Sequence, residues 1–173
     1  MNKLLLVIDM QKDFIDGALG TPEARDIYPR VVEKIKAHAA AGGDVLFTKD
    51  THGEDYMETT EGRHLPVAHC IKGSPGWMLH GELEDLALDI DAIILEKPTF
   101  GSISCAEYIK SLNCDEVEIV GLCTDICVVS NALILKAVAP DLPITVDPQC
   151  CAGVTPESHL AALETMKMCQ VDV

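Results

Sequence analysis

The chain has 173 residues, 48% of them hydrophobic, which is enough for one domain with a full core and too few for two ordinary domains. A formal net charge of −15 argues against nucleic acids and anionic membranes as partners. The apolar run after Lys3 is too short for a secretion signal or a membrane span and ends at Asp9, so we expect a single domain over residues 1–173 in the cytoplasm.

Segments with strand character alternate with helical patterns along the chain. The strand candidates are residues 3–9, 44–49, 91–96, 116–121 and 142–146, with a weaker sixth around 170–173. The helical candidates are residues 27–41, 101–112, 125–138 and 156–168. Strands that are apolar along their whole length and alternate with helices are typical of a three-layer α/β/α fold. We therefore expect a doubly wound, mainly parallel, Rossmann-like sheet of about five to six strands.

Polar side chains stand where the predicted strands end. Asp9 closes the first strand, Asp50 follows the second, Lys97 follows the third, and Cys127 comes shortly after the fourth. In a sheet of order 3-2-1-4-5, the first and fourth strands lie side by side, and ligands bind at their carboxyl ends. We therefore expect these four side chains to meet in one crevice.

The segment 121–128, GLCTDICV, joins the fourth strand to the next helix. Its Thr-Asp pair is a typical helix start, which would place Cys127 in the first helical turn. The free amide groups and the helix dipole at that position favour a thiolate and could bind an oxyanion. With Asp9 able to accept the thiol proton and Lys97 able to stabilise both anions, Cys127 is a candidate nucleophile.

The stretch from residue 51 to 81 is irregular and rich in Gly, Pro, His and acidic residues. An irregular loop of this length in a compact domain is usually functional. Asp50 and His52 stand two positions apart on an extended segment, so their side chains share one face, and His69 follows in the same loop. Mixed carboxylate and imidazole ligands suit Zn, Fe or Mn, so we expect a divalent metal site.

The remaining histidines and the cysteines point to ordinary structural roles. The eight cysteines form no CxxC pair and mostly stand in apolar runs, which favours buried free thiols in a reducing compartment. His38, His80 and His159 fall on predicted helices or at a turn, and we interpret them as surface residues. Trp77 follows a Gly- and Pro-containing turn, and we assign it to packing.

These motifs, in this order and spacing, resemble the isochorismatase-like cysteine hydrolases over nearly the whole chain. Residues 7–14, VIDMQKDF, are similar to the family's opening motif, whose Asp is the general base. Lys97, with Phe100 three residues later, is similar to the family's lysine motif, and residues 121–128 are similar to its nucleophile motif. The resemblance thus implies Asp9 as base, Lys97 as charge-stabilising lysine and Cys127 as nucleophile.

The resemblance also implies an oxyanion site. The family has a non-proline cis peptide bond in this motif, which here would join Leu122 to Cys123. Such a bond would direct the amide of Cys123, together with the amide of Cys127, at the developing oxyanion.

Within the family, the chain resembles the nicotinamidases most. Their Asp-x-His and later Pro-x-His motifs correspond to residues 49–52 and to Pro66 and His69, which are separated by one residue more than usual. The metal of these enzymes holds the pyridine nitrogen of the substrate. Some members add a loop glutamate or histidine as a further ligand, and we expect Glu61 in that role, with His64 as the alternative.

The resemblance finally implies a substrate pocket. Phe14 corresponds to an aromatic residue that stacks on the substrate ring, and we expect Met10 and Phe100 to line the same pocket. Leu65 stands where the family usually has an aromatic residue.

The combined expectation is a metal-dependent amidase that converts nicotinamide, or a close pyridine carboxamide, to the acid and ammonia through a thioester on Cys127. Its partner would be a small-molecule amide, and acidic α/β domains of this size commonly form homo-oligomers. A metal-free isochorismatase-type or carbamoyl-amide hydrolase is the first alternative. A non-catalytic binding or scaffold protein is the second, and the presence of all three catalytic residue types argues against it.

Overall fold

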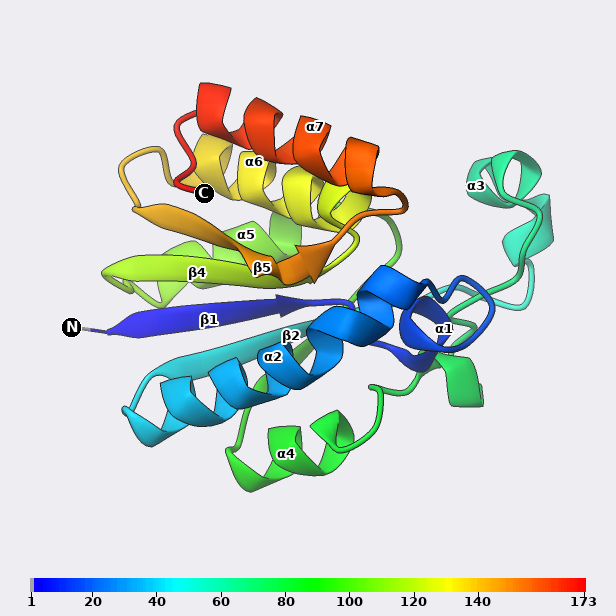
Figure 1. Ribbon diagram of the computed structural model, residues 1–173, viewed down its shortest axis with the longest axis horizontal. Coiled ribbons are helices and arrows are strands. Elements are labelled where there is room, and N and C mark those ends of the chain that lie inside the picture. Colours follow the sequence, from blue (N-terminus) through cyan, green and yellow to red (C-terminus); the bar gives the residue numbers. More distant parts are fainter. Residues whose placement is uncertain (1) are drawn as a thin grey trace.

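The computed structural model describes residues 2–173, which fold around a five-stranded sheet whose strands are all parallel (Figure 1). The strands are β1 (Lys3–Ile8), β2 (Asp44–Asp50), β3 (Ile93–Lys97), β4 (Glu116–Leu122) and β5 (Ile144–Ala152). Their order is β3-β2-β1-β4-β5, which confirms the predicted doubly wound arrangement and places β1 beside β4 at the centre.

Helices cover both faces of the sheet. They are α1 (Lys12–Ile15), α2 (Pro22–Ala40), α3 (Thr60–His64), α4 (Leu83–Asp89), α5 (Ile103–Ser111), α6 (Val129–Val138) and α7 (Pro156–Met168). Figure 1 shows α2 and α4 on one face and α5, α6 and α7 on the other, so the predicted three-layer fold is confirmed. Among residues 2–173, none of these helices combines the length and the apolar character that a bilayer span requires.

Two hydrophobic clusters, one on each face, hold the layers together. Side chains of β1 alternate between them: Leu5 and Val7 pack toward α2, while Leu4, Leu6 and Ile8 pack toward α5, α6 and α7. Because β1 is buried on both faces from Leu4 to Ile8, these five residues are all apolar. Burial of each of these side chains contributes roughly 1.5–3 kcal/mol to the free energy of folding. The sheet is therefore a stable support for the residues at its carboxyl edge.

The predicted helix 156–168 is confirmed at both ends, but α2 begins at Pro22 rather than at residue 27. The Thr21 hydroxyl accepts a hydrogen bond from the Ala24 amide at 3.0 Å, and proline is well suited to the first helical position. The helix then continues through Pro29, although proline in the interior of a helical pattern usually predicts a break.

The end of the sheet also differs from the prediction. Strand β5 runs to Ala152, well beyond residue 146, and contains Pro148, which an edge strand tolerates. The predicted sixth strand is wrong, because Asp172 forms only an isolated bridge with Thr145. All eight cysteines are free, as expected, although Cys169 is exposed rather than buried.

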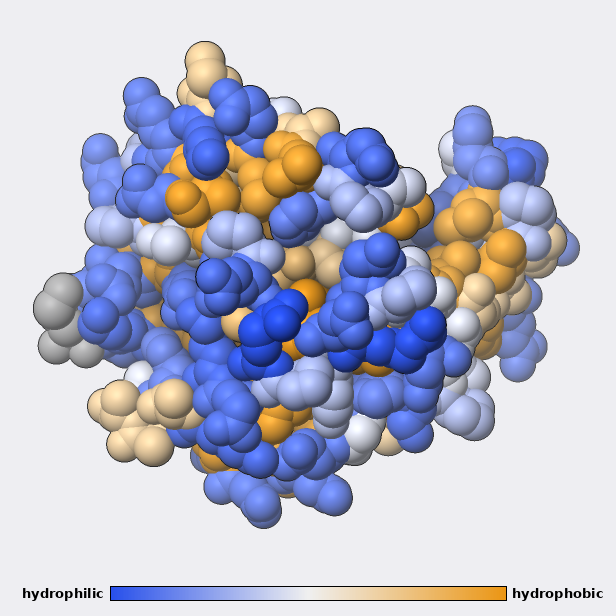
Figure 2. Space-filling view, in the orientation of Figure 1, coloured by the Kyte–Doolittle hydropathy of each residue, from blue (hydrophilic) through white to orange (hydrophobic). Residues whose placement is uncertain are grey.

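The stretch 51–81, predicted to be irregular, contains short helical segments. These are the 3-10 turns Tyr56–Glu58 and Pro75–Trp77 and helix α3, which projects from the body of the molecule (Figure 1). Helices of this length show too few turns for an apolar period to be read, which is also why α1 and α4 were not predicted. Figure 2 shows hydrophilic residues over most of the visible face and hydrophobic residues gathered on the projecting segment, where Met57 and Leu65 are exposed.

Candidate active site

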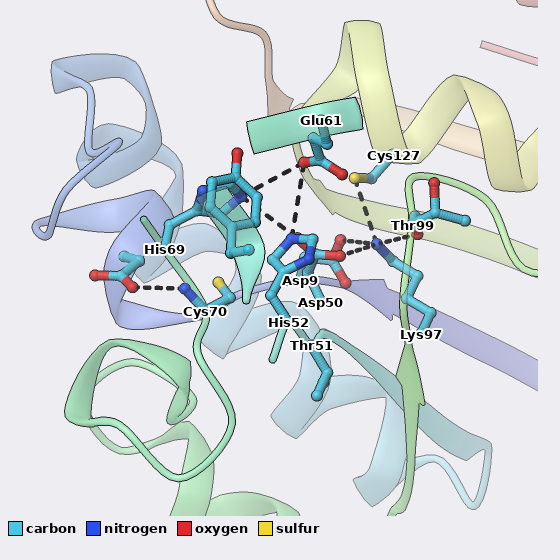
Figure 3. A network of polar contacts seen from close by, with 12 residues as sticks. Asp9, Asp50, Thr51, His52, Glu61, His69, Cys70, Lys97, Thr99 and Cys127 are labelled. Carbon is cyan, nitrogen blue, oxygen red and sulfur yellow. Dashed lines mark hydrogen bonds and ion pairs between the residues drawn. The ribbon is translucent and has the colours of Figure 1, made fainter. Parts of the chain in front are cut away.

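The carboxyl edge of the sheet brings together Asp9, Asp50 and Lys97 from the strand ends and Cys127 from the turn after β4 (Figure 3). The ammonium group of Lys97 lies at the centre. Its Nζ is 2.6 Å from Asp9 Oδ2, 3.3 Å from Asp50 Oδ1 and 3.5 Å from Cys127 Sγ. The convergence expected from the strand order is therefore present.

Lys97 is almost completely buried and remains charged. Burial lowers its pKa, but the negative charge of Asp9 above all, together with that of Asp50, outweighs this effect and raises the pKa above its usual value. The Lys97 ammonium also donates to the Thr99 carbonyl at 3.1 Å. The site thus holds a fixed positive charge beside the sulfur.

Asp9 has no solvent exposure and adopts a left-handed backbone conformation, with a φ angle of 48°. The Thr48 hydroxyl on β2 donates to Asp9 Oδ1 at 2.6 Å. Burial raises the pKa of Asp9, while the charge of Lys97 opposes this shift. A carboxylate with a raised pKa is a better proton acceptor at neutral pH than an exposed one.

Cys127 lies in the turn Thr124–Val128, which has π-helical hydrogen bonding and precedes α6. The helical turn begins at Thr124 and contains Cys127, as predicted, but neither polar side chain caps it. The Thr124 hydroxyl pairs instead with Nδ1 of a half-buried His159 at 2.8 Å, and the Asp125 carboxylate accepts from the Val154 amide at 3.1 Å. His159 is thus a partner of this turn rather than a surface residue.

The protonation state of the sulfur also differs from the expectation. The helix-start argument favours a thiolate, but burial raises the pKa of the Cys127 thiol well above its usual value. The negative charge of Asp9 adds to this shift, and Lys97 opposes it. The sulfur therefore keeps its proton until the adjacent carboxylate removes it.

The peptide bond between Leu122 and Cys123 is cis, as the family resemblance implied. The Cys123 carbonyl accepts hydrogen bonds from the amides of Ile126 and Val128, at 3.1 and 3.0 Å. These bonds close the turn that carries Cys127, so both cysteines are fixed at the wall of the same cavity.

A second group of side chains lies beside the first. Ligand atoms of Asp50, His52, Glu61 and His69 all lie within 4.8 Å of one another. Asp50 Oδ2 is 3.0 Å from His52 Nε2 and 3.7 Å from His69 Nε2, and Glu61 Oε1 is 3.7 Å from each imidazole Nε2. These are the four residues that the sequence suggested as metal ligands.

The chemistry of this group fits a divalent metal ion. Nδ1 of His69 pairs with the Val67 carbonyl at 2.8 Å, so it acts as the donor and leaves the Nε2 lone pair for the cluster. Burial opposes ionisation of Asp50, but its hydrogen bond with His52 and the charge of Lys97 lower its pKa, so the carboxylate is charged. Two imidazole nitrogens and two carboxylates suit Zn, Fe or Mn.

Glu61, rather than His64, completes the group. Glu61 projects from α3 toward the two histidines, whereas His64 is exposed and its ring pairs with the Thr60 carbonyl at 2.8 Å. Two backbone hydrogen bonds, from the His52 amide to the Cys70 carbonyl at 3.0 Å and from the Lys72 amide to the His52 carbonyl at 2.9 Å, join the two loop segments that carry the histidines.

Both groups open on one cavity of about 240 Å³. Cys127, Asp50, Glu61 and His69 form its polar wall. Its other wall is mainly apolar and is formed by Phe14, Leu19, Thr21, Leu65, Phe100, Cys123, Ile126 and Val154. An engineered apolar cavity of about 150 Å³ is enough for benzene, so this volume suits a single aromatic ring with a small substituent.

Two of the three residues expected to line the pocket do so. Phe14 and Phe100 are at the cavity wall, and the Phe14 ring lies 5.5 Å from the His69 ring. The expectation for Met10 is wrong, because its side chain is fully buried in the hydrophobic cluster under α2. Trp77 packs as predicted, with Lys49 Nζ 3.3 Å from the ring centroid.

Gln11 was not anticipated from the sequence, although it fixes the position of Asp50. Its buried amide donates to the Asp50 carbonyl at 2.8 Å and to the Trp77 carbonyl at 3.0 Å, and accepts from the Asp50 amide at 2.7 Å. In the sequence, Gln11 is visible only as a polar residue that follows an apolar strand. Such residues are common at strand ends, so this feature does not predict which residue Gln11 contacts.

Comparisons with known proteins agree with this geometry. The model of the isochorismatase domain family matches residues 3–173. A nicotinamidase/pyrazinamidase from Mycobacterium tuberculosis (strain ATCC 25618 / H37Rv) is 29% identical over 99% of this chain and 97% of that protein.

Two solved structures have the same fold over nearly their whole length. A nicotinamidase/pyrazinamidase from Bacillus subtilis superimposes with a TM-score of 0.87, at 30% identity, covering 100% of this chain and 99% of that one. A pyrazinamidase of Pyrococcus horikoshii, solved in complex with zinc, gives a TM-score of 0.84 at 28% identity and covers 99% and 98% of the two chains.

Proposed function

The chain belongs to the isochorismatase family, and we propose that it is a nicotinamidase-like amidohydrolase that converts nicotinamide, or a close pyridine carboxamide, to the acid and ammonia. One observation carries the proposal: Cys127 of the Asp9–Lys97–Cys127 cluster and three of the four possible metal ligands line one cavity, and Asp50 contacts both groups. The named activities of relatives that match over nearly the whole chain support it.

The chemistry would begin at the sulfur. Asp9 takes the thiol proton, and Lys97, 3.5 Å from Sγ, stabilises the thiolate as it forms. Cys127 then attacks the amide carbon, and the backbone amides of Cys123 and Cys127 bind the oxyanion of the tetrahedral intermediate. Asp9 returns the proton to the leaving nitrogen, and ammonia departs from a thioester.

Hydrolysis of the thioester completes the cycle. Asp9, ionised again, takes a proton from water, whose oxygen attacks the thioester carbon. The acid leaves, and the proton returns to Cys127. One amide and one water are consumed, and one acid and one ammonia are formed.

Asp50, His52, Glu61 and His69 would hold a divalent metal ion beside this centre. When bound, the ion supplies a Lewis acid for the pyridine nitrogen. Phe14 would stack on the ring from the apolar wall, and Phe100 would close that wall, so that the carboxamide faces Cys127.

The four converging ligand atoms separate this proposal from a metal-free isochorismatase-type or carbamoyl-amide hydrolase. A non-catalytic scaffold would not require Asp9, Lys97 and Cys127 to lie in contact within a buried site. The free thiols support a location in the reducing cytoplasm, and the chain length supports a single-domain enzyme. We further propose that the protein forms homo-oligomers, which sedimentation of the purified protein tests.

Ammonia release over a panel of nicotinamide, pyrazinamide and ureido compounds tests the proposed function. We expect turnover of the two heteroaromatic carboxamides, nicotinamide and pyrazinamide, and little turnover of the ureido compounds. Turnover of ureido compounds alone, with less than about 0.2 metal ion per chain, would instead favour the metal-free branch of the family.

A further inference from the structure

We propose that Asn131 is a positioning residue, which fastens the loop after Lys97 to the helix that follows Cys127 and thereby sets the spacing between the lysine and the sulfur. Neither the catalytic cluster nor the metal ligands include it. The expected effect on turnover rests on the proposed function, whereas the expected effect on the thiol does not.

The contacts of Asn131 join two chain segments that are far apart in sequence. Asn131 lies on α6, one turn after Cys127, and only 4% of its surface is exposed. Its Nδ2 donates to the Cys127 carbonyl at 2.8 Å and to the Phe100 carbonyl at 3.0 Å, and its Oδ1 accepts from the Ser102 amide at 3.0 Å. One side chain thus bridges the nucleophile turn and the loop 98–102.

Only a primary amide can satisfy all three partners. Both carbonyl partners require a donor and the Ser102 amide requires an acceptor, so the orientation of the Asn131 amide is determined by its surroundings. An aspartate of the same shape would keep the acceptor but would direct negative charge at two carbonyl oxygens. Burying like charges or an unpaired polar group is unfavourable, so the loop would move to relieve it.

The loop that Asn131 fastens passes close to α6 and to the ammonium group of Lys97. It connects β3, which ends at Lys97, to α5, and a Cβ added at Gly101 would lie 2.5 Å from the Ile134 side chain on α6. The Thr99 carbonyl accepts from Lys97 Nζ at 3.1 Å, so a shift of the loop would change the environment of the ammonium group. Phe100, in the same loop, forms part of the cavity wall.

The first measurement uses the unmodified protein. If Asn131 holds the loop, the Ser102 amide must exchange slowly with deuterium, because it is hydrogen-bonded to a buried side chain. Exchange at the rate of an open loop would overturn the proposal, whether or not any variant folds.

The second measurement compares Asn131→Asp and Asn131→Ser with Ser130→Ala, a control one residue earlier on α6. We expect each Asn131 variant to lower kcat roughly 10- to 100-fold with KM within about 3-fold, because the reacting groups are misplaced while the pocket persists. Alkylation of Cys127 by iodoacetamide, followed by mass spectrometry of its peptide, should slow roughly in parallel, because the thiol loses the nearby positive charge. Ser130→Ala should leave both rates unchanged.

Two outcomes in a variant that retains the fold would overturn the proposal. One is a kcat within about 2-fold of wild type, and the other is a reduced kcat with an unchanged alkylation rate, which would indicate a purely structural role. If the wild-type enzyme releases ammonia from no pyridine amide, the proposed function fails, and the alkylation rates still decide the role of Asn131.

Discussion

The two halves of the site are built differently. Asp9 follows β1 and Lys97 ends β3, the two parallel strands on either side of β2, and almost no surface of either residue is exposed. His52, Glu61 and His69 come from the long segment after β2, and Glu61 sits on the projecting helix α3. The comparison teaches that strand ends hold the base and the lysine of the thiol site, whereas three of the four possible metal ligands depend on the position of the segment after β2.

The largest effect should come from the sheet half. Cys127→Ala removes the nucleophile, and we expect ammonia release to fall at least about 10³-fold, with the metal content unchanged. An ammonia assay and elemental analysis of the same sample provide the measurement. Cys169→Ala, which changes an exposed cysteine far from the cavity, should behave as wild type. Residual turnover above a few per cent would reject Cys127 as nucleophile.

Asp9→Asn should have the next largest effect. The amide keeps the size of the carboxylate but cannot take the thiol proton, so kcat should fall roughly 10²- to 10⁴-fold. The metal should again be retained, because Asp9 contacts Lys97 and Thr48 rather than the histidines. Steady-state kinetics with metal analysis tests this, and loss of the metal would show that the two halves are not separable.

His69→Ala breaks the loop half. We expect metal content to fall below about 0.2 ion per chain and nicotinamide turnover to fall roughly 10- to 100-fold, because one imidazole ligand is lost. Iodoacetamide should still alkylate Cys127 at nearly the wild-type rate. His64→Ala, an exposed histidine on the same segment, is the matched control. A thiol that becomes unreactive in His69→Ala would contradict the separation of the two halves.

Gln11→Leu tests how the two halves are joined. Gln11 binds the backbone of Asp50, and Asp50 contacts both Lys97 and His52. The change leaves the buried Asp50 amide without its acceptor, so we expect the free energy of unfolding to fall by roughly 1–3 kcal/mol. Metal affinity should fall about 10-fold, as when other supporting partners of ligands are removed. Chemical denaturation and metal titration measure the two effects. An unchanged metal affinity would show that the loop alone positions Asp50.

The ion pair between Lys34 and Asp147 lies outside both halves of the site, so breaking it should slightly lower the free energy of unfolding and leave catalysis unchanged. Lys34 lies 2.8 Å from Asp147; burial raises the pKa of Asp147, but the hydrogen bond from Lys34 outweighs this and lowers it. A depressed carboxyl pKa contributes stability that is present above the unfolded-state value, near 3.9, and is lost as the pH falls through the folded-state value.

Lys34→Met should therefore reduce the free energy of unfolding at pH 7 by no more than about 1 kcal/mol, because the pair is partly exposed. The difference from wild type should shrink as the pH falls below about 4. Denaturation curves at both pH values check the trend. A difference that grows at acidic pH, or a change in kcat, would contradict it.

The sequence predicted the sheet order and the catalytic cluster more accurately than the loop. A polar residue that closes an apolar strand is visible locally, and the strand order then places Asp9, Lys97 and Cys127 at one edge. Helix α3 is too short to show a period, so Glu61 could be suggested only through the family resemblance. Met10 was misplaced because its neighbours in sequence are at the site while its side chain points into the core.

Local patterns in the sequence therefore determined which residue types stand at the strand ends, because apolar periodicity and strand termination depend on neighbours along the chain. Only the tertiary structure decided how those residues behave. Gln11 meets Asp50 across 39 positions and Asn131 meets Ser102 across 29, and no local pattern encodes such pairs. The protonation of Cys127 was likewise decided by burial, because the desolvation of a thiol depends on everything that packs around it.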